Sequence, residues 1–421
     1  MKLFKVEIFP RLVAAFPLLF PLYLFRGEVL GMPVTLPEVL LIFMCVFFVL
    51  REELWRPSWW AKNAYKWKIW PLWIFVVAAV IGALLAPEVA YMMDGNEFAG
   101  RLKAFGILKG WIFAPLAYFF MARTYFQEKP GLIPFALRAL MLGGVFLAIL
   151  ALQQVWTGDF LTPDGRASGP FESANYLALY LGPIVVYGFL AFARGKELGS
   201  GEFLSGGATM FWRIFLGLGL LVCLGALYAT LSYAAWIAVA AALVVALLVH
   251  SRKLPRKVQV GIWASLFVIG GLALVSQFGS DKFEQFLDFT ERSSTTVRLQ
   301  VYQISLAMIQ DSPLLGIGLG QFEQVYQEIA PLVLGQDPYE WNMPHPHNIL
   351  LGFWLNMGFF GLISFIWLCV RALPWLLEQD KHEHRIAALM LVAILVHGMF
   401  DMPYFKNDLA FQFWFLLAIL L

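Results

Sequence analysis

The stretch HNILLGFWLNMGFFGLISFIWLCV, residues 347–370, decides the fold class. It contains no charged residue, and it exceeds the roughly 20 apolar residues that a helix needs to cross a bilayer. The whole 421-residue chain agrees with it, because 60% of the residues are hydrophobic and only 14% are charged. Soluble domains usually carry about a quarter charged residues. The chain is therefore predicted to be an integral membrane protein.

The apolar runs indicate helices rather than barrel strands, because they do not alternate with a period of two. Only helices and closed barrels satisfy every backbone group inside lipid. We predict an all-α integral membrane protein with about 12 transmembrane helices, the first retained rather than cleaved as a leader. Their approximate cores are 12–25, 34–50, 69–86, 104–122, 132–155, 175–193, 213–231, 233–250, 258–276, 347–370, 386–400 and 408–421.

The distribution of basic residues predicts the orientation. With the N-terminus inside, the inside segments carry 20 of the 30 Lys and Arg residues and the outside segments carry 8, while Lys109 and Arg138 fall within spans. The positive-inside rule then predicts that both termini are cytoplasmic. The net charge of +2 is too small to indicate a nucleic-acid partner. Cys45, Cys223 and Cys369 all lie in apolar runs, so they are predicted to be packing residues.

One long segment without a span divides the chain. Residues 277–346 separate transmembrane helices 1–9 (residues 1–276) from helices 10–12 (residues 347–421), and the charge rule places this large loop outside. Its location makes it the predicted catalytic loop of the protein.

The loop has helical patterns of its own. The stretch TTVRLQVYQISLAMIQ (295–310) predicts an amphipathic helix on the membrane surface. A second short helix is predicted for QFEQVYQEIAPLV (321–333). The intervening GIGLG (316–320) lacks the lysine and the spacing of a phosphate-binding loop, so it predicts a turn.

A polar cluster ends this loop. His345 and His347 flank Pro346, and Asn348 follows directly. Histidine is tolerated at membrane interfaces, and Asn348 could cap a helix. However, a polar cluster at a membrane surface costs desolvation energy unless it is used or paired. A histidine near its ordinary pKa is a natural general base for a hydroxyl nucleophile, which is the role we favour.

A metal site is the alternative for the same histidines. His397 and Asp401, near the outer end of the eleventh span, could complete a set with His345 and His347. The ligands would be scattered, and the intervening proline limits their convergence. We predict no metal.

Basic residues of the outside segments could bind phosphate. Arg298 and Arg292 precede the histidines in the large loop, and Arg166 lies in another outside loop. Arginine suits bidentate phosphate binding, although each could instead contact solvent or lipid headgroups. Lys109, near the outer end of its span, is placed to line a cavity. Asn175 more simply caps the sixth span.

At this point the sequence resembles a known family. His347–Asn348, nine further residues and then Gly358–Gly361 match the signature of the O-antigen ligase and O-antigen polymerase superfamily. Further matches are SGPFESANYLALYL (168–181), VRLQVYQISLAMIQDSPLLGIGLGQF (297–322) and HGMFDMPYFKNDLAFQFW (397–414). The resemblance covers most of the second half and does not separate ligases from polymerases.

The resemblance implies a GT-C-type membrane glycosyltransferase of the bacterial cytoplasmic (inner) membrane, with its active site on the periplasmic face. It would take a glycan from undecaprenyl pyrophosphate and place it on lipid A–core, as in lipopolysaccharide biosynthesis, or on another lipid-linked repeat. His347 would be the base and Arg298 a pyrophosphate contact. Neither a metal nor a cofactor is implied.

The chain departs from the family pattern in two places. The family often has an arginine after serine in the eighth-span motif, where this chain has Tyr233 and Ala234, so Arg166 or Lys109 would have to substitute. Tyr302 stands where leucine often follows the loop arginine. In the expected inverting transfer, Asn348 or His345 orients the acceptor. Four residues are expected to support the site, namely Asn175, Tyr233, His397 and Asp401.

Two other classes of protein are compatible with the composition. Twelve spans with both ends inside also suit a transporter, but carriers tend to show repeated halves and ionisable groups at mid-membrane. A structural or assembly protein would leave the His-Asn signature without a purpose. Within the enzyme class, ligase and polymerase both remain open.

Overall fold

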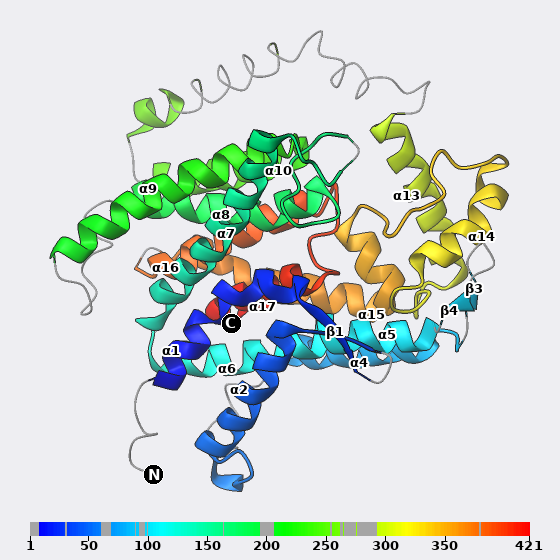
Figure 1. Ribbon diagram of the computed structural model, residues 1–421, viewed down its shortest axis with the longest axis horizontal. Helices are drawn as coiled ribbons and strands as arrows, with labels where there is room; N and C mark the ends of the chain where they lie inside the picture. The colour runs from blue at the N-terminus through cyan, green and yellow to red at the C-terminus, as the bar shows by residue number, and fades with distance from the viewer. Residues whose placement is uncertain are drawn as a thin grey trace.

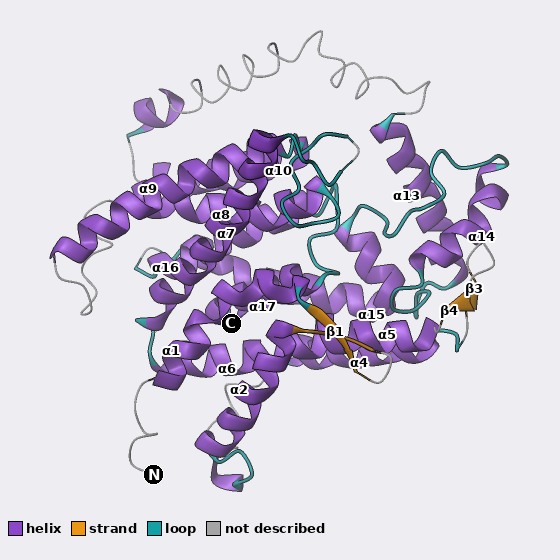
Figure 2. Ribbon diagram, in the orientation of Figure 1, coloured by secondary structure: helices purple, strands orange, loops and turns teal. Residues whose placement is uncertain are grey.

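The computed structural model describes residues 8–29, 32–59, 69–88, 90–91, 97–98, 100–162, 164–193, 206–252, 255–261, 264, 275, 293–378 and 380–421. Within these ranges the chain is a helical bundle with two small hairpins (Figures 1 and 2). The elements of the first half are α1 (Ile8–Ala15), η2 (Phe16–Leu24), β1 (Arg26–Val29), β2 (Met32–Thr35), α2 (Leu36–Glu52), α4 (Trp70–Leu85), β3 (Ala90–Tyr91), β4 (Glu97–Phe98), α5 (Gly100–Ile107), the π-helix η4 (Leu108–Phe113), α6 (Ala114–Glu128), α7 (Leu132–Thr157) and α8 (Ala174–Ala193). The second half contains α9 (Gly206–Ala229), α10 (Tyr233–Ser251), α13 (Ser294–Asp311), α14 (Phe322–Leu334), α15 (Ile349–Ala372), η6 (Leu373–Leu376), α16 (His382–His397) and α17 (Asn407–Leu420).

The predicted all-α class is confirmed. Helices lie at the positions of eleven of the twelve predicted spans, and most of the ninth, 258–276, lies outside the described residues. Six described helices are long and apolar enough to cross a membrane, so the count of twelve crossings stays a prediction. The hairpins β1–β2 and β3–β4 were not expected; each pairs two short antiparallel strands.

The C-terminal helix α17 lies at the centre of the bundle (Figure 1). Every residue from Asp408 to Leu420 is buried, as expected for a helix that is apolar on all sides. It packs against α6, α16 and η2, and Phe411 stacks on Phe20 of η2. The last predicted span is therefore an internal helix that other helices surround.

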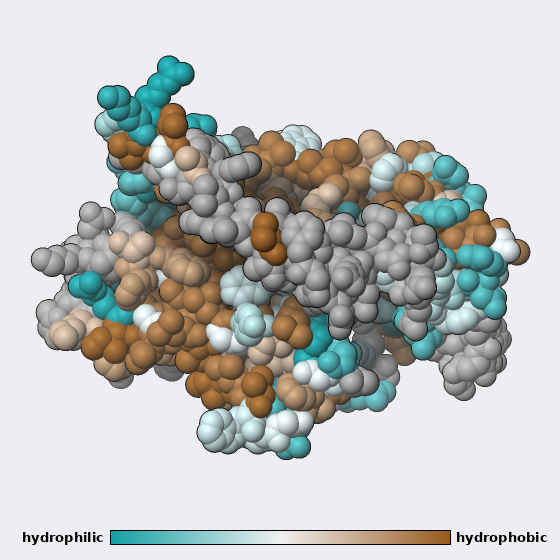
Figure 3. All heavy atoms as spheres, turned by 90° about the horizontal axis from the view of Figure 1, so that it is seen from above, coloured by the Kyte–Doolittle hydropathy of each residue, from teal (hydrophilic) through white to brown (hydrophobic). Residues whose placement is uncertain are grey.

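The outer faces of the bundle are apolar. Along α9, Phe211, Ile214, Leu218 and Leu221 recur at helical spacing, and each is more than half exposed. Apolar residues also form a broad area across the face seen in Figure 3. A helix that points its large apolar side chains away from the protein core is suited to lipid rather than water. The chain is a membrane protein.

The described part of the large loop is a helical unit with its own core. Helices α13 and α14 lie side by side at one end of the molecule (Figure 1), which confirms both predicted helices. Val301, Ile304 and Met308 are buried against α14, whereas Leu306 is half exposed. The apolar face of α13, which was predicted to lie on the membrane surface, therefore packs largely against α14 inside this unit.

A glycine-rich loop joins this unit to the bundle. Helix α15 is kinked at Gly358, where φ is 70° and ψ is −174°. The kink breaks the helical hydrogen bond between the Phe359 N–H and the Leu355 carbonyl. Backbone groups of the glycine-rich loop supply the missing partners. Ile317 N–H donates to Leu355 (2.8 Å), and Phe359 N–H donates to the Leu314 carbonyl (3.1 Å). The GIGLG stretch is a turn, as predicted, that locks the α13–α14 unit into α15.

Candidate functional site

The histidine loop is fixed by the start of α15. The Asn348 side chain accepts hydrogen bonds from the N–H groups of Leu350 (2.9 Å) and Leu351 (3.2 Å), and its Nδ2 donates to the Met399 carbonyl (3.2 Å). Asn348 therefore has the helix-capping role that the sequence offered as the simpler alternative. The preceding His347 has a φ of 49°, in the left-handed region, which costs a non-glycine residue about 1 kcal/mol or more.

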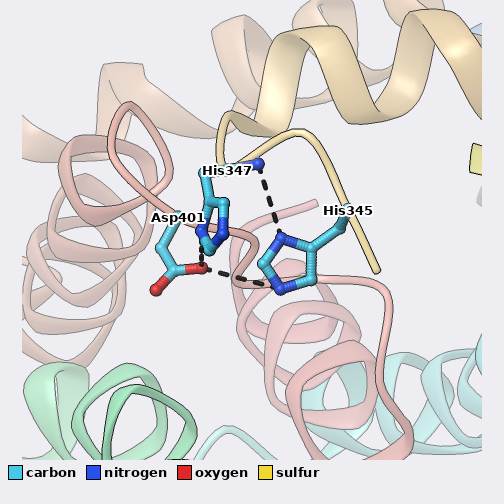
Figure 4. Close-up of side chains that lie close together, drawn as sticks. All are labelled: His345, His347 and Asp401. Carbon is cyan, nitrogen blue, oxygen red and sulfur yellow. Dashed lines mark hydrogen bonds and ion pairs between the residues drawn. The ribbon is translucent and has the colours of Figure 1, made fainter. Parts of the chain in front are cut away.

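His347 forms a hydrogen-bonded pair with Asp401 (Figure 4). Its Nδ1 lies 3.2 Å from Oδ1 of Asp401, which comes from the loop between α16 and α17. The same oxygen accepts from the N–H of Met402 (2.8 Å), so the carboxylate is held in place. Asp401 is 4% exposed and the His347 side chain 21%. The pair is thus nearly dry on the carboxylate side and open on the imidazole side.

Asp401 is ionised in this environment. Burial alone raises the pKa of a carboxyl group, but among the effects that lower it the hydrogen bond that His347 donates is the largest. The pKa of Asp401 is therefore held well below its usual range. When the His347 ring carries one proton, its hydrogen bond to an ionised Asp401 places that proton on Nδ1, which leaves Nε2 as the proton acceptor. No hydrogen bond to that Nε2 comes from the described residues.

His345 lies behind this pair. Its Nδ1 faces the backbone N–H of His347 (3.4 Å), and its Nε2 is 3.9 Å from Oδ1 of Asp401. Burial and the nearby His347 lower the pKa of His345 to about 4. His345 is therefore neutral near pH 7, and it is better placed to hold His347 than to exchange protons. The ring of Tyr176 packs on it, with centroids 6.3 Å apart.

Helix α13 adds two side chains one turn apart. The Tyr302 hydroxyl lies 3.2 Å from the His347 carbonyl and 3.3 Å from the Met399 carbonyl, so it ties the histidine loop to the loop that carries Asp401. Burial raises the pKa of Tyr302, and the hydroxyl stays protonated. Arg298 precedes it by four residues and lies on the same face of α13. The Arg298 Nε is buried and has no hydrogen-bond partner among the described residues.

A comparison with known protein families matches the middle segment of the chain. Residues 218–366 match the family model described as O-antigen ligase. This match supports the resemblance of the chain to the O-antigen ligase and polymerase superfamily. No curated protein matches the chain. The matched segment contains α10, α13, α14 and both histidines, so it includes two of the segments that carry the resemblance, 297–322 and 347–361, but not 168–181 or 397–414. The matched segment ends before Asp401. The pairing of Asp401 with His347 is therefore seen only in the structure.

Two further basic residues expected at the pyrophosphate of an O-antigen ligase have internal partners. Arg166 donates from Nε to the Thr230 carbonyl (2.7 Å) and from an Nη to Oδ1 of Asn175 (2.8 Å). Lys109 donates to the Pro33 carbonyl and pairs with Glu38 at 3.2 Å. Both tie structural elements together, so neither presents a wholly unengaged cation. Arg292 lies outside the described residues.

The remaining supporting residues differ in their surroundings. Asn175 accepts from Arg166 and thereby fixes the loop before α8. Tyr233 is 38% exposed at the start of α10. His397 is 2% exposed, and its Nε2 has no hydrogen-bond partner among the described residues. The structure thus brings together His345, His347, Asp401 and, through α13, Arg298 and Tyr302.

The same centre has a metal-compatible donor set. One ligand atom each from His345, His347 and Asp401 lies within 4.8 Å of the others, and these are residue types that bind zinc. The hydrogen bond between Nδ1 and Oδ1 accounts for their approach without an ion. The prediction that the family chemistry needs no metal stays a prediction.

Sequence reasoning missed the role of Tyr302. It was noted only as a departure from leucine, because a single aromatic residue on an amphipathic helix gives no local sign of its hydrogen bonds. Tyr176 was missed for the same reason. The available signal was spacing, since Tyr302 follows Arg298 by four residues and therefore lies on the same helical face.

Proposed function

We propose that this protein transfers a glycan from undecaprenyl pyrophosphate to an acceptor hydroxyl on the periplasmic face of the inner membrane, as an O-antigen ligase. The acceptor in this proposal is lipid A–core. The single observation that carries it is the His347–Asp401 pair, with a proton-accepting nitrogen on the open side. The match of residues 218–366 to the O-antigen ligase family model supports the reaction class.

His347 acts as the general base in this scheme. Asp401 holds the ring by Nδ1 and stabilises the imidazolium that forms when Nε2 takes the hydroxyl proton. His345 and Tyr302 hold the His347 backbone from two sides. General-base assistance of this kind contributes about 10²- to 10⁴-fold in rate.

The reaction is an inverting displacement. The acceptor oxygen forms a bond to the anomeric carbon, the bond from that carbon to the pyrophosphate oxygen breaks, and undecaprenyl pyrophosphate leaves with the electron pair. Arg298 binds the pyrophosphate as its charge grows. The unpartnered Nε of Arg298 supports this role, because a buried guanidinium donor without a partner is costly unless a ligand completes it. No metal is needed in this scheme.

The topology in this proposal has both termini in the cytoplasm and the α13–α14 unit in the periplasm. The distribution of Lys and Arg supports it. The polyprenyl tail would lie along apolar outer helices, where each buried methylene contributes about 0.8 kcal/mol.

The deciding experiment offers one lipid-linked glycan to purified protein in nanodiscs. One reaction contains lipid A–core, and a second contains another lipid-linked repeat. A glycan on lipid A–core supports the ligase, and an extended lipid-linked chain identifies a polymerase instead. The His347→Ala variant should insert normally and lose most transfer. Substrate movement without any change of bonds would indicate a transporter and defeat the proposal.

A further inference from the structure

A second cation lies beside the candidate site, in a cage of aromatic rings. Nζ of Lys406 is 4.0 Å from the ring centroid of Phe171, 4.1 Å from that of Tyr176 and 4.9 Å from that of Tyr23. The side chain is only 12% exposed. Contacts of a cation with aromatic faces are worth about 0.5–2 kcal/mol each, so the cage holds the ammonium group without using its N–H donors.

The ammonium group has no hydrogen-bond partner among the described residues. Its nearest carboxylate oxygen, Oδ1 of Asp408, is 3.8 Å away, which is too far for a hydrogen bond. Neither Asp408 oxygen has a hydrogen-bond partner there either, and the side chain is fully buried. Burial lowers the pKa of Lys406 to about 8, so the group still carries its charge near pH 7. The three N–H donors of this largely buried ammonium group therefore lack an acceptor within the described part of the chain.

The cage is continuous with the histidine centre. The ring centroid of Tyr176 lies 4.1 Å from the Lys406 ammonium and 6.3 Å from the centroid of the His345 ring. Lys406 also stands five residues after Asp401, in the same loop between α16 and α17. The loop before α8, which supplies Phe171, is fastened by the hydrogen bonds of Arg166 to Thr230 and Asn175. Tyr176 thus contacts both the histidine centre and this cation.

We propose that Lys406 is a further substrate-binding residue, whose ammonium group contacts the pyrophosphate oxygens of the lipid-linked donor. It takes the part of the arginine that the family often has in the eighth-span motif, where Tyr233 offers no cation. This assignment rests on the proposed function. Entry of the anionic group gives the ammonium the acceptors that Asp408 does not supply, and no covalent bond changes at Lys406.

The test measures binding of inorganic pyrophosphate to the full chain in nanodiscs, with glycan transfer measured in parallel. Lys406→Met keeps most of the length of the side chain and removes the charge, whereas Lys406→Arg keeps the charge. Lys257→Met removes a distant, exposed cation and serves as the matched control. Lys406→Met should weaken pyrophosphate binding by about 10- to 100-fold. It should also raise KM for the donor more than it lowers kcat. Lys406→Arg should retain most of the affinity, and Lys257→Met should match the wild type.

A double variant separates binding from structure. If Lys406 served only to neutralise Asp408, Lys406→Met with Asp408→Asn would restore both thermal stability and pyrophosphate affinity. A binding role predicts that stability recovers while affinity stays weak. Restored affinity in the double variant, or wild-type affinity in Lys406→Met, overturns the assignment even if transfer by the wild type stands. Conversely, a wild type that binds pyrophosphate through Lys406 but transfers glycan to no acceptor defeats the proposed function alone.

Discussion

Replacing Asp401 by asparagine tests the central pair without removing the base. The amide has nearly the shape of the carboxylate, and its oxygen can still accept from the Met402 N–H. It loses the negative charge that stabilises protonated His347. If its NH₂ group turns toward His347, Nδ1 must become an acceptor and the proton moves to Nε2, where it blocks base catalysis.

The size of the effect follows from the 3.2 Å separation of Nδ1 and Oδ1. A hydrogen bond to a charged group contributes about 1.5–3 kcal/mol. Two unit charges at that separation attract by about 5 kcal/mol at an effective dielectric constant of about 20. Between these bounds, a loss of about 3–4 kcal/mol of transition-state stabilisation corresponds to a fall in kcat of about 10²- to 10³-fold.

Single-turnover transfer with saturating lipid-linked donor measures this fall directly. KM for the donor and thermal stability should stay close to those of the wild type, because the variant changes neither the pyrophosphate contacts nor the packing. A kcat within about threefold of the wild type would show that Asp401 does not stabilise the reacting imidazole. An equal loss of stability and activity would point instead to a purely structural carboxylate.

Three further predictions follow from the same geometry. Arg298→Ala should raise KM for the donor by about 10-fold or more, as expected for one lost charge-assisted contact. Arg298→Lys should restore part of the lost affinity. An unchanged KM in steady-state transfer would show that Arg298 is not part of the binding site. Gly358→Ala should destabilise the protein by more than about 3 kcal/mol, because φ is 70° and the new Cβ would lie 2.2 Å from the Leu314 carbonyl oxygen; Gly131→Ala, with open space at that position, is the matched control in thermal unfolding, and equal unfolding temperatures would contradict the strain argument. Lowering the pH from 7 toward 4 should destabilise the wild type more than the His345→Asn variant. The pKa of His345 is about 4 in the folded protein and about 6.5 in the unfolded chain, so the unfolded state binds an extra proton in this pH range. Parallel pH dependences of the unfolding temperature in the two proteins would rule this out.

The helical unit of the large loop was predictable because its signals are local. Helix α13 begins after Ser293, which caps it, and its apolar residues recur at helical spacing. Helix α14 ends at Gly335, which has a positive φ of 67°. Both features are properties of neighbouring residues, so a single sequence contains them. The hairpin β1–β2 was missed because its strands are only four residues long and lie between two apolar runs.

The assembly of the site was only partly predictable. The sequence suggests Asp401 as a partner of the histidines only in the role of a metal ligand. It shows that these side chains are polar and lie in outside segments, but it does not show the distance between them. Lys406 was counted merely as one of the outside basic residues. Its burial depends on rings from η2, the loop before α8 and α8 itself, which lie more than 200 residues away in the chain. Such long-range packing leaves no local pattern.

The spacing within the family signature has a mechanical explanation in α15. Asn348 caps the helix and sets the backbone of His347, while Gly358 opens the helix so that the glycine-rich loop can enter. Ten residues separate these positions, or about 15 Å of helix at 1.5 Å per residue. One helix therefore holds the proposed base at its end and the anchor of the α13–α14 unit three turns away.

Because Arg298 and Tyr302 belong to that anchored unit, their distance from His347 depends on the length of this helical segment. Inserting or deleting one residue between Asn348 and Gly358 would rotate the anchor by about 100° relative to the cap and would separate Tyr302 from the His347 carbonyl. The fixed spacing of the signature thus holds the helix cap at Asn348 and the kink at Gly358 in a constant relative orientation, on which the proposed chemistry depends.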